Sequence, residues 1–280
     1  SLFVTLTIFS LFLATSPAGA VPNFSNASLS TRGTERTLRL PAAADNSDVI
    51  SLGRAVDSRS GTVVEGIAFI HHKKDFARGG NQAPAATTSS SCYSFLAKDT
   101  KWKVVEPWLV NSTNSRGLGD TFVLNNLTAH IAKWEDAGDG IVGNAVGANI
   151  LGNGTATTST LSVDTAAPDG QNEVYFANVS SPGAIAVTIV WGVFSGPTFQ
   201  RRLVEWDQVY DDVDFDWSAS GAAGKMDFEN IATHELGHAV GMGHPSDSCV
   251  NETMYRFADF GETKKRDLNA GDIAGANKLY

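Results

Sequence analysis

Positive charge is scarce in this sequence and mostly scattered. The 280 residues include 21 Lys and Arg against 30 Asp and Glu, which gives a formal net charge of -9. Nucleic acid binding needs clustered basic side chains that neutralise phosphates, so no nucleic acid partner is expected. One compact basic run is His71-His72-Lys73-Lys74, and we expect it to be a solvated loop.

Long hydrophobic runs are also lacking, except at the N-terminus. Residues Leu2 to Leu13 are almost wholly apolar and lead into Ala18-Gly19-Ala20, a small-x-small cleavage pattern. Residues 1–20 are therefore expected to be a secretory signal peptide, which predicts a secreted, extracellular protein without a stable membrane anchor. The alternative, a membrane anchor, is disfavoured because the run is too short to span a bilayer comfortably.

Cysteine occurs only twice, as Cys92 and Cys249. In the oxidising compartment that a signal peptide implies, the two are expected to form one disulfide. Secretion in a eukaryotic host would also permit glycosylation of surface loops at Asn-x-Ser/Thr sequons. Such sequons begin at Asn23, Asn26, Asn111, Asn126, Asn153, Asn178 and Asn251.

The most informative segment present is His234-Glu235-Leu236-Gly237-His238-Ala239-Val240-Gly241-Met242-Gly243-His244. His234 and His238 are four residues apart, so on a helix both can direct a ring nitrogen at one metal ion. Gly241 allows the helix to end and the chain to turn back, because a residue without Cβ enters the left-handed conformation at little cost. His244 can then approach the same ion. Three protein ligands leave a fourth position open for water, as in a catalytic zinc site.

Glu235 lies beside the first ligand, where a carboxylate can act as general base without occupying a ligand position. The segment therefore predicts one catalytic Zn²⁺ held by His234, His238 and His244, and hydrolysis by a zinc-bound water. An ordinary amphipathic helix with solvated or buried histidines is the other interpretation. It is disfavoured because this combination of residues rarely arises by chance.

The motif resembles that of the metzincin metallopeptidases, and the residues around it are similar to those of the matrixins. Thr253-Met254-Tyr255 looks like the Met-turn, in which a methionine underlies the zinc site. Residues 268–280 resemble the matrixin C-terminal helix, and Val204-Glu205-Trp206-Asp207 resembles the strand before the active-site helix. The resemblance covers about residues 100–280 and implies that Met254 supports the site by packing.

Several features depart from the matrixin pattern. Pro245 follows the third histidine, as in the serralysin branch, so the choice of branch stays open. His130 is the only other histidine in the region, and a second, structural zinc site is therefore not predicted. Arg256 stands where matrixins commonly have proline in a substrate-pocket wall. Cys92 as a thiolate on the zinc of a latent precursor is a rival to the disulfide, but its flanking residues do not resemble the matrixin switch motif.

Acidic residues in predicted loops leave Ca²⁺ as a second cofactor that the chain could bind. Ordinary surface loops and a solvated acidic turn are the alternatives, because no known calcium-loop pattern is present. The residues concerned are Asp136, Asp139, Asp164 and Asp169, followed by Asp211, Asp212, Asp214 and Asp216.

The chain is expected to divide into a signal peptide (1–20), a pro-segment and linker (21–95), and a catalytic domain (96–280). Residues 21–60 are rich in Ser, Ala, Asn and Thr, which predicts loose attachment. A strand is predicted over Val63 to Ile70, followed by linker sequence over Asn81 to Ser91.

Within the catalytic domain we predict a helix from a cap at Asp120-Thr121 and several strands. The resemblance implies an α+β metzincin fold: a twisted, mostly parallel five-stranded sheet with an antiparallel edge strand, two long helices, a Met-turn and a C-terminal helix. Residues Ala184 to Trp191 would be that edge strand, although their apolarity equally suits a buried central strand. The strands are expected over Trp102 to Val110, Glu173 to Val179, Ala184 to Trp191 and Arg202 to Val209.

The expected function is therefore that of a secreted, monomeric zinc endopeptidase acting on protein or peptide substrates. The alternative is a non-catalytic secreted zinc-binding glycoprotein on the same scaffold. The intact Glu235 argues against that alternative, because a binding module needs no general base.

Overall fold

The computed structural model describes residues 36–41, 47–74 and 89–280, and all of these belong to one unit of the chain. The expected signal peptide, the sequons at Asn23 and Asn26 and most of the predicted linker lie outside the described residues. Within the described ranges, every helix is too short or too polar to cross a membrane.

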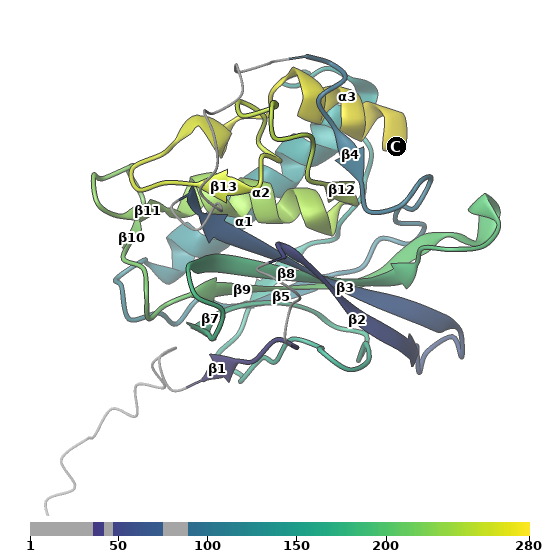
Figure 1. Ribbon diagram of the computed structural model, residues 1–280, viewed down its shortest axis with the longest axis horizontal. Coiled ribbons are helices and arrows are strands. Elements are labelled where there is room, and N and C mark those ends of the chain that lie inside the picture. Colours follow the sequence, from purple (N-terminus) through teal and green to yellow (C-terminus); the bar gives the residue numbers. More distant parts are fainter. Residues whose placement is uncertain (1–35, 42–46, 75–88) are drawn as a thin grey trace, which may run out of the picture. The chain divides into compact units, whose positions relative to one another are not determined.

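One mixed sheet forms the centre of this unit (Figure 1). Its path runs β13-β3-β8-β9-β7-β5-β6, with β1 beside β7 and β2 beside β3. The strands are β1 (Thr37–Leu38), β2 (Val49–Val56), β3 (Val63–Lys73), β5 (Trp108–Asn111), β6 (Gly154–Ala156), β7 (Asn172–Val179), β8 (Ala184–Val193), β9 (Arg202–Asp211) and β13 (Phe257–Ala258).

The strand directions confirm the predicted fold class. Strands β5, β7 and β9 run parallel, and β8 runs antiparallel to β9. Strands β7, β8 and β9 match the expected ranges to within two residues at each end. Their apolar side chains are buried on both faces of the sheet, which is why the sequence shows near-continuous apolar runs there.

The sheet has more than the predicted five strands, and β1, β2 and β3 come from the expected pro-segment. Strand β3 pairs antiparallel with β8, so β8 lies between β9 and β3 and not at an edge. Strand β2 pairs antiparallel with β3 in turn. The loose attachment expected for residues 21–60 is therefore wrong for β2, whose backbone groups gain partners from β3.

The basic run 71–74 is not a solvated loop. His71 and His72 are buried at the end of β3, where His71 pairs with Ala186 of β8 and His72 with Ala184. The apolar strand predicted over 63–70 continues through His71 and His72, and only Lys74 at the end of the run is exposed.

The three α-helices of the described residues lie on one side of the sheet, with α3 farthest from it (Figure 1). They are α1 (Asp120–Asp136), α2 (Phe228–Ala239) and α3 (Ala270–Leu279). The predicted helix is present as α1, and it is amphipathic, since Leu127, Ile131 and Trp134 enter the core against the sheet. The predicted cap is wrong: α1 has Gly119 at its N-cap, and Asp120 accepts a hydrogen bond from the Ser112 hydroxyl at 2.8 Å.

Short strands and 3-10 turns complete the fold. Strand β4 (Ser94–Phe95) pairs antiparallel with β12 (Met242–Gly243), just after α2. The strand predicted from Trp102 begins only at Trp108, after Pro107, which cannot donate a ladder hydrogen bond. The remaining elements are β10 (Trp217–Ser218), β11 (Met226–Asp227), and the 3-10 turns Ala137–Asp139, Thr198–Gln200 and Lys264–Arg266.

Candidate metal centre and active site

Helix α2 carries His234, Glu235 and His238, and its two ends are set by local chemistry. At the N-terminus the Asp227 side chain accepts a hydrogen bond from Asn230 N at 3.0 Å, which satisfies one free helix donor. The helix ends at Ala239, and Gly241 adopts a φ of 109°. This is the turn predicted from the glycine, and it returns the chain toward His244.

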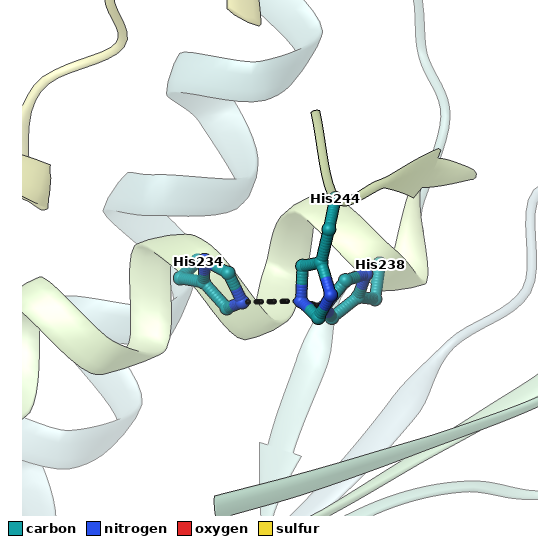
Figure 2. Close-up of side chains that lie close together, drawn as sticks. All are labelled: His234, His238 and His244. Atoms are coloured by element: carbon teal, nitrogen blue, oxygen red, sulfur yellow. Dashed lines mark hydrogen bonds between the residues drawn. The ribbon is translucent and has the colours of Figure 1, made fainter. Parts of the chain in front are cut away.

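The three histidines that the motif predicted as ligands point their Nε2 atoms at one another (Figure 2). The Nε2 atoms of His238 and His244 are 3.1 Å apart, and those of His244 and His234 are 3.3 Å apart. Zn–N bonds of about 2.0–2.1 Å at tetrahedral angles place ligand nitrogens about 3.3 Å apart. The spacing therefore fits three corners of a zinc tetrahedron.

Each ring is oriented through its other nitrogen. Nδ1 of His234 donates to the carbonyl oxygen of Thr253 at 2.7 Å, and Nδ1 of His238 donates to that of Met242 at 2.9 Å. Nδ1 of His244 donates to Oδ2 of Asp48 at 2.9 Å. A proton fixed on Nδ1 leaves the Nε2 lone pair free for a metal ion.

Burial acts on the three imidazoles in the same direction. Desolvation lowers the pKa of each ring, which keeps it neutral, and neutral imidazole is the form that binds metal. The donor set, the spacing and the protonation state all fit Zn²⁺.

Glu235 is fully buried, and both of its carboxylate oxygens have partners. Oε2 accepts from the hydroxyl of Thr188 on β8 at 2.6 Å. Oε1 lies 3.0 Å from Nδ1 of His71 on β3. Burial raises the pKa of Glu235 to about 8, in the range that suits a group exchanging protons near neutral pH.

The turn beneath the histidines is held from α3. Asp272 accepts from the backbone N–H groups of Thr253 at 2.7 Å and Met254 at 3.2 Å. Met254 is fully buried beneath α2, and a Cβ at Gly237 would overlap its sulfur. The glycine inside the motif therefore allows the Met-turn to approach the helix, a role that its sequence position alone did not suggest.

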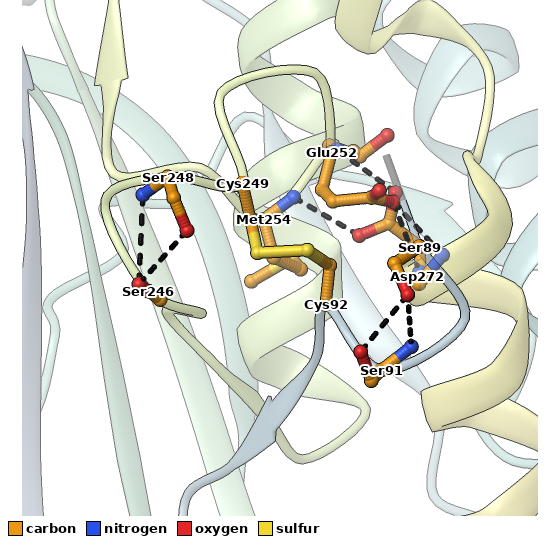
Figure 3. The surroundings of a disulfide bond; sticks show 11 residues. Ser89, Ser91, Cys92, Ser246, Ser248, Cys249, Glu252, Met254 and Asp272 are labelled. Atoms are coloured by element: carbon orange, nitrogen blue, oxygen red, sulfur yellow. Dashed lines mark hydrogen bonds between the residues drawn. A yellow bond between two sulfur atoms is a disulfide. The ribbon is translucent and has the colours of Figure 1, made fainter. Parts of the chain in front are cut away.

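Cys92 and Cys249 form the expected disulfide, with their Cα atoms 5.7 Å apart (Figure 3). The bond ties the segment that precedes β4 to the loop between His244 and Met254. Because the sulfur of Cys92 is bonded to that of Cys249, the rival assignment of Cys92 as a thiolate zinc ligand is wrong for this structure.

Lys265 is a buried residue of the site that the sequence did not single out. Its Nζ lies 3.0 Å from Nε2 of His71 and also bonds the carbonyl oxygen of Tyr255. Burial lowers its pKa to about 7. If Lys265 donates to Nε2 of His71, then Nδ1–H of His71 donates to Glu235 and a continuous hydrogen-bonded chain reaches the predicted general base.

A carboxyl cluster lies away from the histidines. Oxygens of Asp164, Glu205 and Asp207 come within 4.8 Å of one another. Both Asp207 oxygens accept backbone N–H groups, from Glu173 and Asp164, at 3.0 Å. Burial raises the pKa of Glu205 to about 9, which favours a protonated carboxyl beside Asp164.

Asp211, Asp212 and His130 have structural partners. Asp211 accepts the backbone N–H of Val179 at 2.7 Å, and Asp212 accepts that of Ser115 at 2.7 Å. His130 bridges α1 to α2 through the Thr233 hydroxyl at 2.9 Å.

Comparison with known proteins finds relatives for the C-terminal part of the chain. Residues 195–280 match the sequence profile of the family described as Matrixin. The chain is 42% identical to human Matrilysin over 69 residues, 25% of each protein. It is 46% identical to Metalloendoproteinase 1-MMP of Arabidopsis thaliana over 56 residues, which are 20% of this chain and 14% of the relative.

A third relative gives the same result. Metalloendoproteinase 1 of Glycine max is 40% identical over 75 residues, 25% of this chain and 24% of the relative. The match spans a quarter or less of the length of these relatives. Over its C-terminal region the chain is matrixin-like, which confirms the predicted resemblance to the metzincin metallopeptidases.

Proposed function

We propose that this matrixin-like chain is a secreted zinc-dependent endopeptidase that hydrolyses peptide bonds in proteins, with Glu235 as its general base. The observation that carries the proposal is the convergence of three Nε2 atoms whose rings are oriented through Nδ1. His234, His238 and His244 would hold the ion. Zn²⁺ bound there would polarise the scissile carbonyl and lower the pKa of its water toward about 7.

Glu235 supplies the proton transfers. Its carboxylate takes a proton from the attacking water and later delivers it to the leaving amine. Thr188 donates to Oε2 at 2.6 Å and so fixes that oxygen. The other oxygen, Oε1, would carry the proton, which requires that His71 no longer occupies it. Met254 supports the histidines by packing and takes no part in the chemistry.

Secretion and a precursor form belong to the same proposal. The small-x-small pattern after Leu13 supports a signal peptide over 1–20, and the disulfide fits an oxidising compartment. Residues 21–95 would be the pro-segment and linker, and 96–280 the catalytic domain. Protein or peptide substrates follow from the endopeptidase assignment, and the acidic net charge does not favour nucleic acid. A monomeric state is part of the same proposal.

The test uses the chain from residue 21 onward, loaded with one equivalent of Zn²⁺ and incubated with a peptide library. N-terminal sequencing follows any processing of the chain itself. We expect cleavage that a chelator abolishes and added Zn²⁺ restores. Glu235→Gln should retain zinc but lose at least about a thousandfold in turnover.

Glu229→Gln is the matched control on the same helix, since Glu229 pairs with His130 and lies outside the histidine cluster. It should cleave at the parent rate. Zinc binding without cleavage of any peptide, in processed as well as unprocessed protein, would favour the alternative of a non-catalytic zinc-binding glycoprotein.

A further inference from the structure

Residues 47–74, here called the N-terminal hairpin, contact every residue of the predicted catalytic group. Asp48 accepts from His244, and the Phe69 ring stacks on His238 with centroids 4.1 Å apart. His71 packs on His234 with centroids 3.9 Å apart. The same His71 bonds Glu235 at 3.0 Å.

We propose that the N-terminal hairpin is an autoinhibitory segment: β3 occupies the place of an extended peptide substrate along β8, and His71 blocks Glu235. The proposal rests on the endopeptidase function proposed above and specifies how that activity is regulated. The occupant is a named segment of this chain, and the contacts that hold it are non-covalent.

The first argument is the pairing of the strands. Strand β3 pairs antiparallel with β8 from Glu65 opposite Gly192 to His72 opposite Ala184. Strand β9 takes the other side of β8. A peptide can add to a sheet only along a strand with unpaired N–H and C=O groups. While β3 is in place, β8 offers none along this stretch.

The second argument is the burial of the reacting groups. His234 and Glu235 have no exposed surface, and His238 has 1%. A scissile carbonyl must approach the metal, and a water molecule must approach Glu235 Oε1. The side chains of Phe69 and His71 fill that space, so the described structure has no room for a substrate at the predicted base.

The third argument is that the hairpin is held on both sides of the histidine cluster by residues outside the zinc motif. On one side, the Arg256 guanidinium lies 3.4 Å from Asp48 and 2.7 Å from Asp247. On the other, buried Lys265 bonds the outer nitrogen of His71. Arg256 occupies a position in the expected substrate-pocket wall. Its ion pair with Asp48 of the hairpin is therefore consistent with a hairpin that takes the place of substrate.

The disulfide excludes a cysteine-based form of the same regulation. Cys92 is bonded to Cys249, so neither sulfur can reach the metal centre as a thiolate. Inhibition would therefore end when β3 leaves β8, without any change of a metal–sulfur bond.

Two kinds of variant test this inference in the full chain. Gly66→Val places side-chain atoms where the Trp191 ring lies 2.6 Å from a Cβ, so it should displace β3 from β8 without touching the histidines. His71→Ala removes the contact with Glu235. The matched controls are Gly119→Ala, whose Cβ meets nothing within 4 Å, and Arg54→Ala, in an exposed ion pair of the same hairpin.

The readout does not depend on catalysis. All variants are combined with Glu235→Gln and loaded with Zn²⁺, and binding of a fluorescent peptide hydroxamate is measured by anisotropy. Amide exchange of β8 is measured in parallel. Removing an occluding state raises apparent affinity in proportion to the accessible fraction, so Gly66→Val should bind at least about tenfold more tightly and exchange faster in β8.

His71→Ala in the active background should raise the initial rate of peptide cleavage before any N-terminal processing, whereas Arg54→Ala and Gly119→Ala should match the parent. Equal hydroxamate affinity and equal cleavage in parent and Gly66→Val would overturn the inference. Loss of zinc in His71→Ala alone would also overturn it, since His71 would then belong to the metal centre. Tighter hydroxamate binding without turnover in any variant would support occlusion and contradict the endopeptidase function.

Discussion

Two regions meet at the predicted metal centre, and they differ in how the sequence encodes their positions. In α2 and the turn after it, the spacing of His234, His238 and His244 along the chain determines the site. In the N-terminal hairpin, strand register determines it: His71 reaches Glu235 across 164 residues of sequence. The first region is matched by the matrixin profile, and the second is not. The motif therefore predicts the chemistry of the site, but it does not predict that the N-terminal hairpin lies over it.

Substitutions in the two regions should differ most in their effect on zinc affinity. His238→Ala removes one of three ligands and should weaken zinc binding by about a thousandfold, since a few ligands together supply about 10–16 kcal/mol in small zinc sites. His71→Ala should keep one zinc per chain. Chelator competition measures both. An equal loss of zinc in the two variants would show that the hairpin is part of the metal centre.

The disulfide should contribute the next largest effect. Cys92→Ser with Cys249→Ser opens a loop closed over 157 residues of sequence separation, and the expected loss of stability is about 2–5 kcal/mol. Denaturant unfolding of the double variant and the parent measures it. An unchanged midpoint would mean that the bond does not stabilise the loop between His244 and Met254.

The two regions differ in how far the sequence alone predicts them. The clustering of the three histidines, the disulfide, α1, α2 and strands β7 to β9 follow from local patterns or from a resemblance, and the structure places them within a few residues of expectation. Periodicity and caps act over short distances, which is why such elements can be read from one sequence.

The hairpin contacts could not be predicted in the same way. Apolar residues in 63–70 correctly predicted a strand, but nothing in them specifies β8 as its partner or His71 as the residue opposite Ala186. Lys265 lies within a Lys-Lys-Arg run that suggests a solvated surface, although its side chain is buried. Such placements depend on long-range packing that overrides local composition.

Gly237 tests the packing beneath the helix. In an open helix Gly→Ala would stabilise by about 1 kcal/mol. Here the new Cβ would overlap Met254 and crowd Trp134, so Gly237→Ala should destabilise the protein by about 2 kcal/mol. Thermal unfolding, with Gly119→Ala as control, measures the difference. A rise in midpoint would contradict the close approach of the Met-turn.

The carboxyl cluster of Asp164, Glu205 and Asp207 should give the smallest effect, which concerns the pH dependence of stability. The pKa of Glu205 is raised to about 9, so its protonated form is favoured in the fold. The associated stability is complete below its ordinary pKa near 4.5 and is lost as pH rises toward about 9. Glu205→Gln, which cannot ionise, should therefore be more stable than the parent by about 1 kcal/mol at pH 9 and similar at pH 5.

Thermal unfolding midpoints of the parent and Glu205→Gln at pH 5, 7 and 9 measure this dependence of stability on pH. Parallel slopes in the two proteins would contradict the buried, protonated carboxyl. A rise in the parent midpoint with added Ca²⁺ that Glu205→Gln abolishes would instead assign the cluster to a bound cation.

The most direct test of the account compares initial peptide hydrolysis by zinc-loaded Gly66→Val with that by the same protein carrying Glu235→Gln. Displacing β3 should expose the site, and Glu235 should then carry the proton transfers. We predict hydrolysis by the single variant that exceeds that of the unprocessed parent, and a loss of at least about a thousandfold in the double variant at unchanged zinc content. Equal rates in the single and double variants would contradict the assignment of Glu235 and the function built on it.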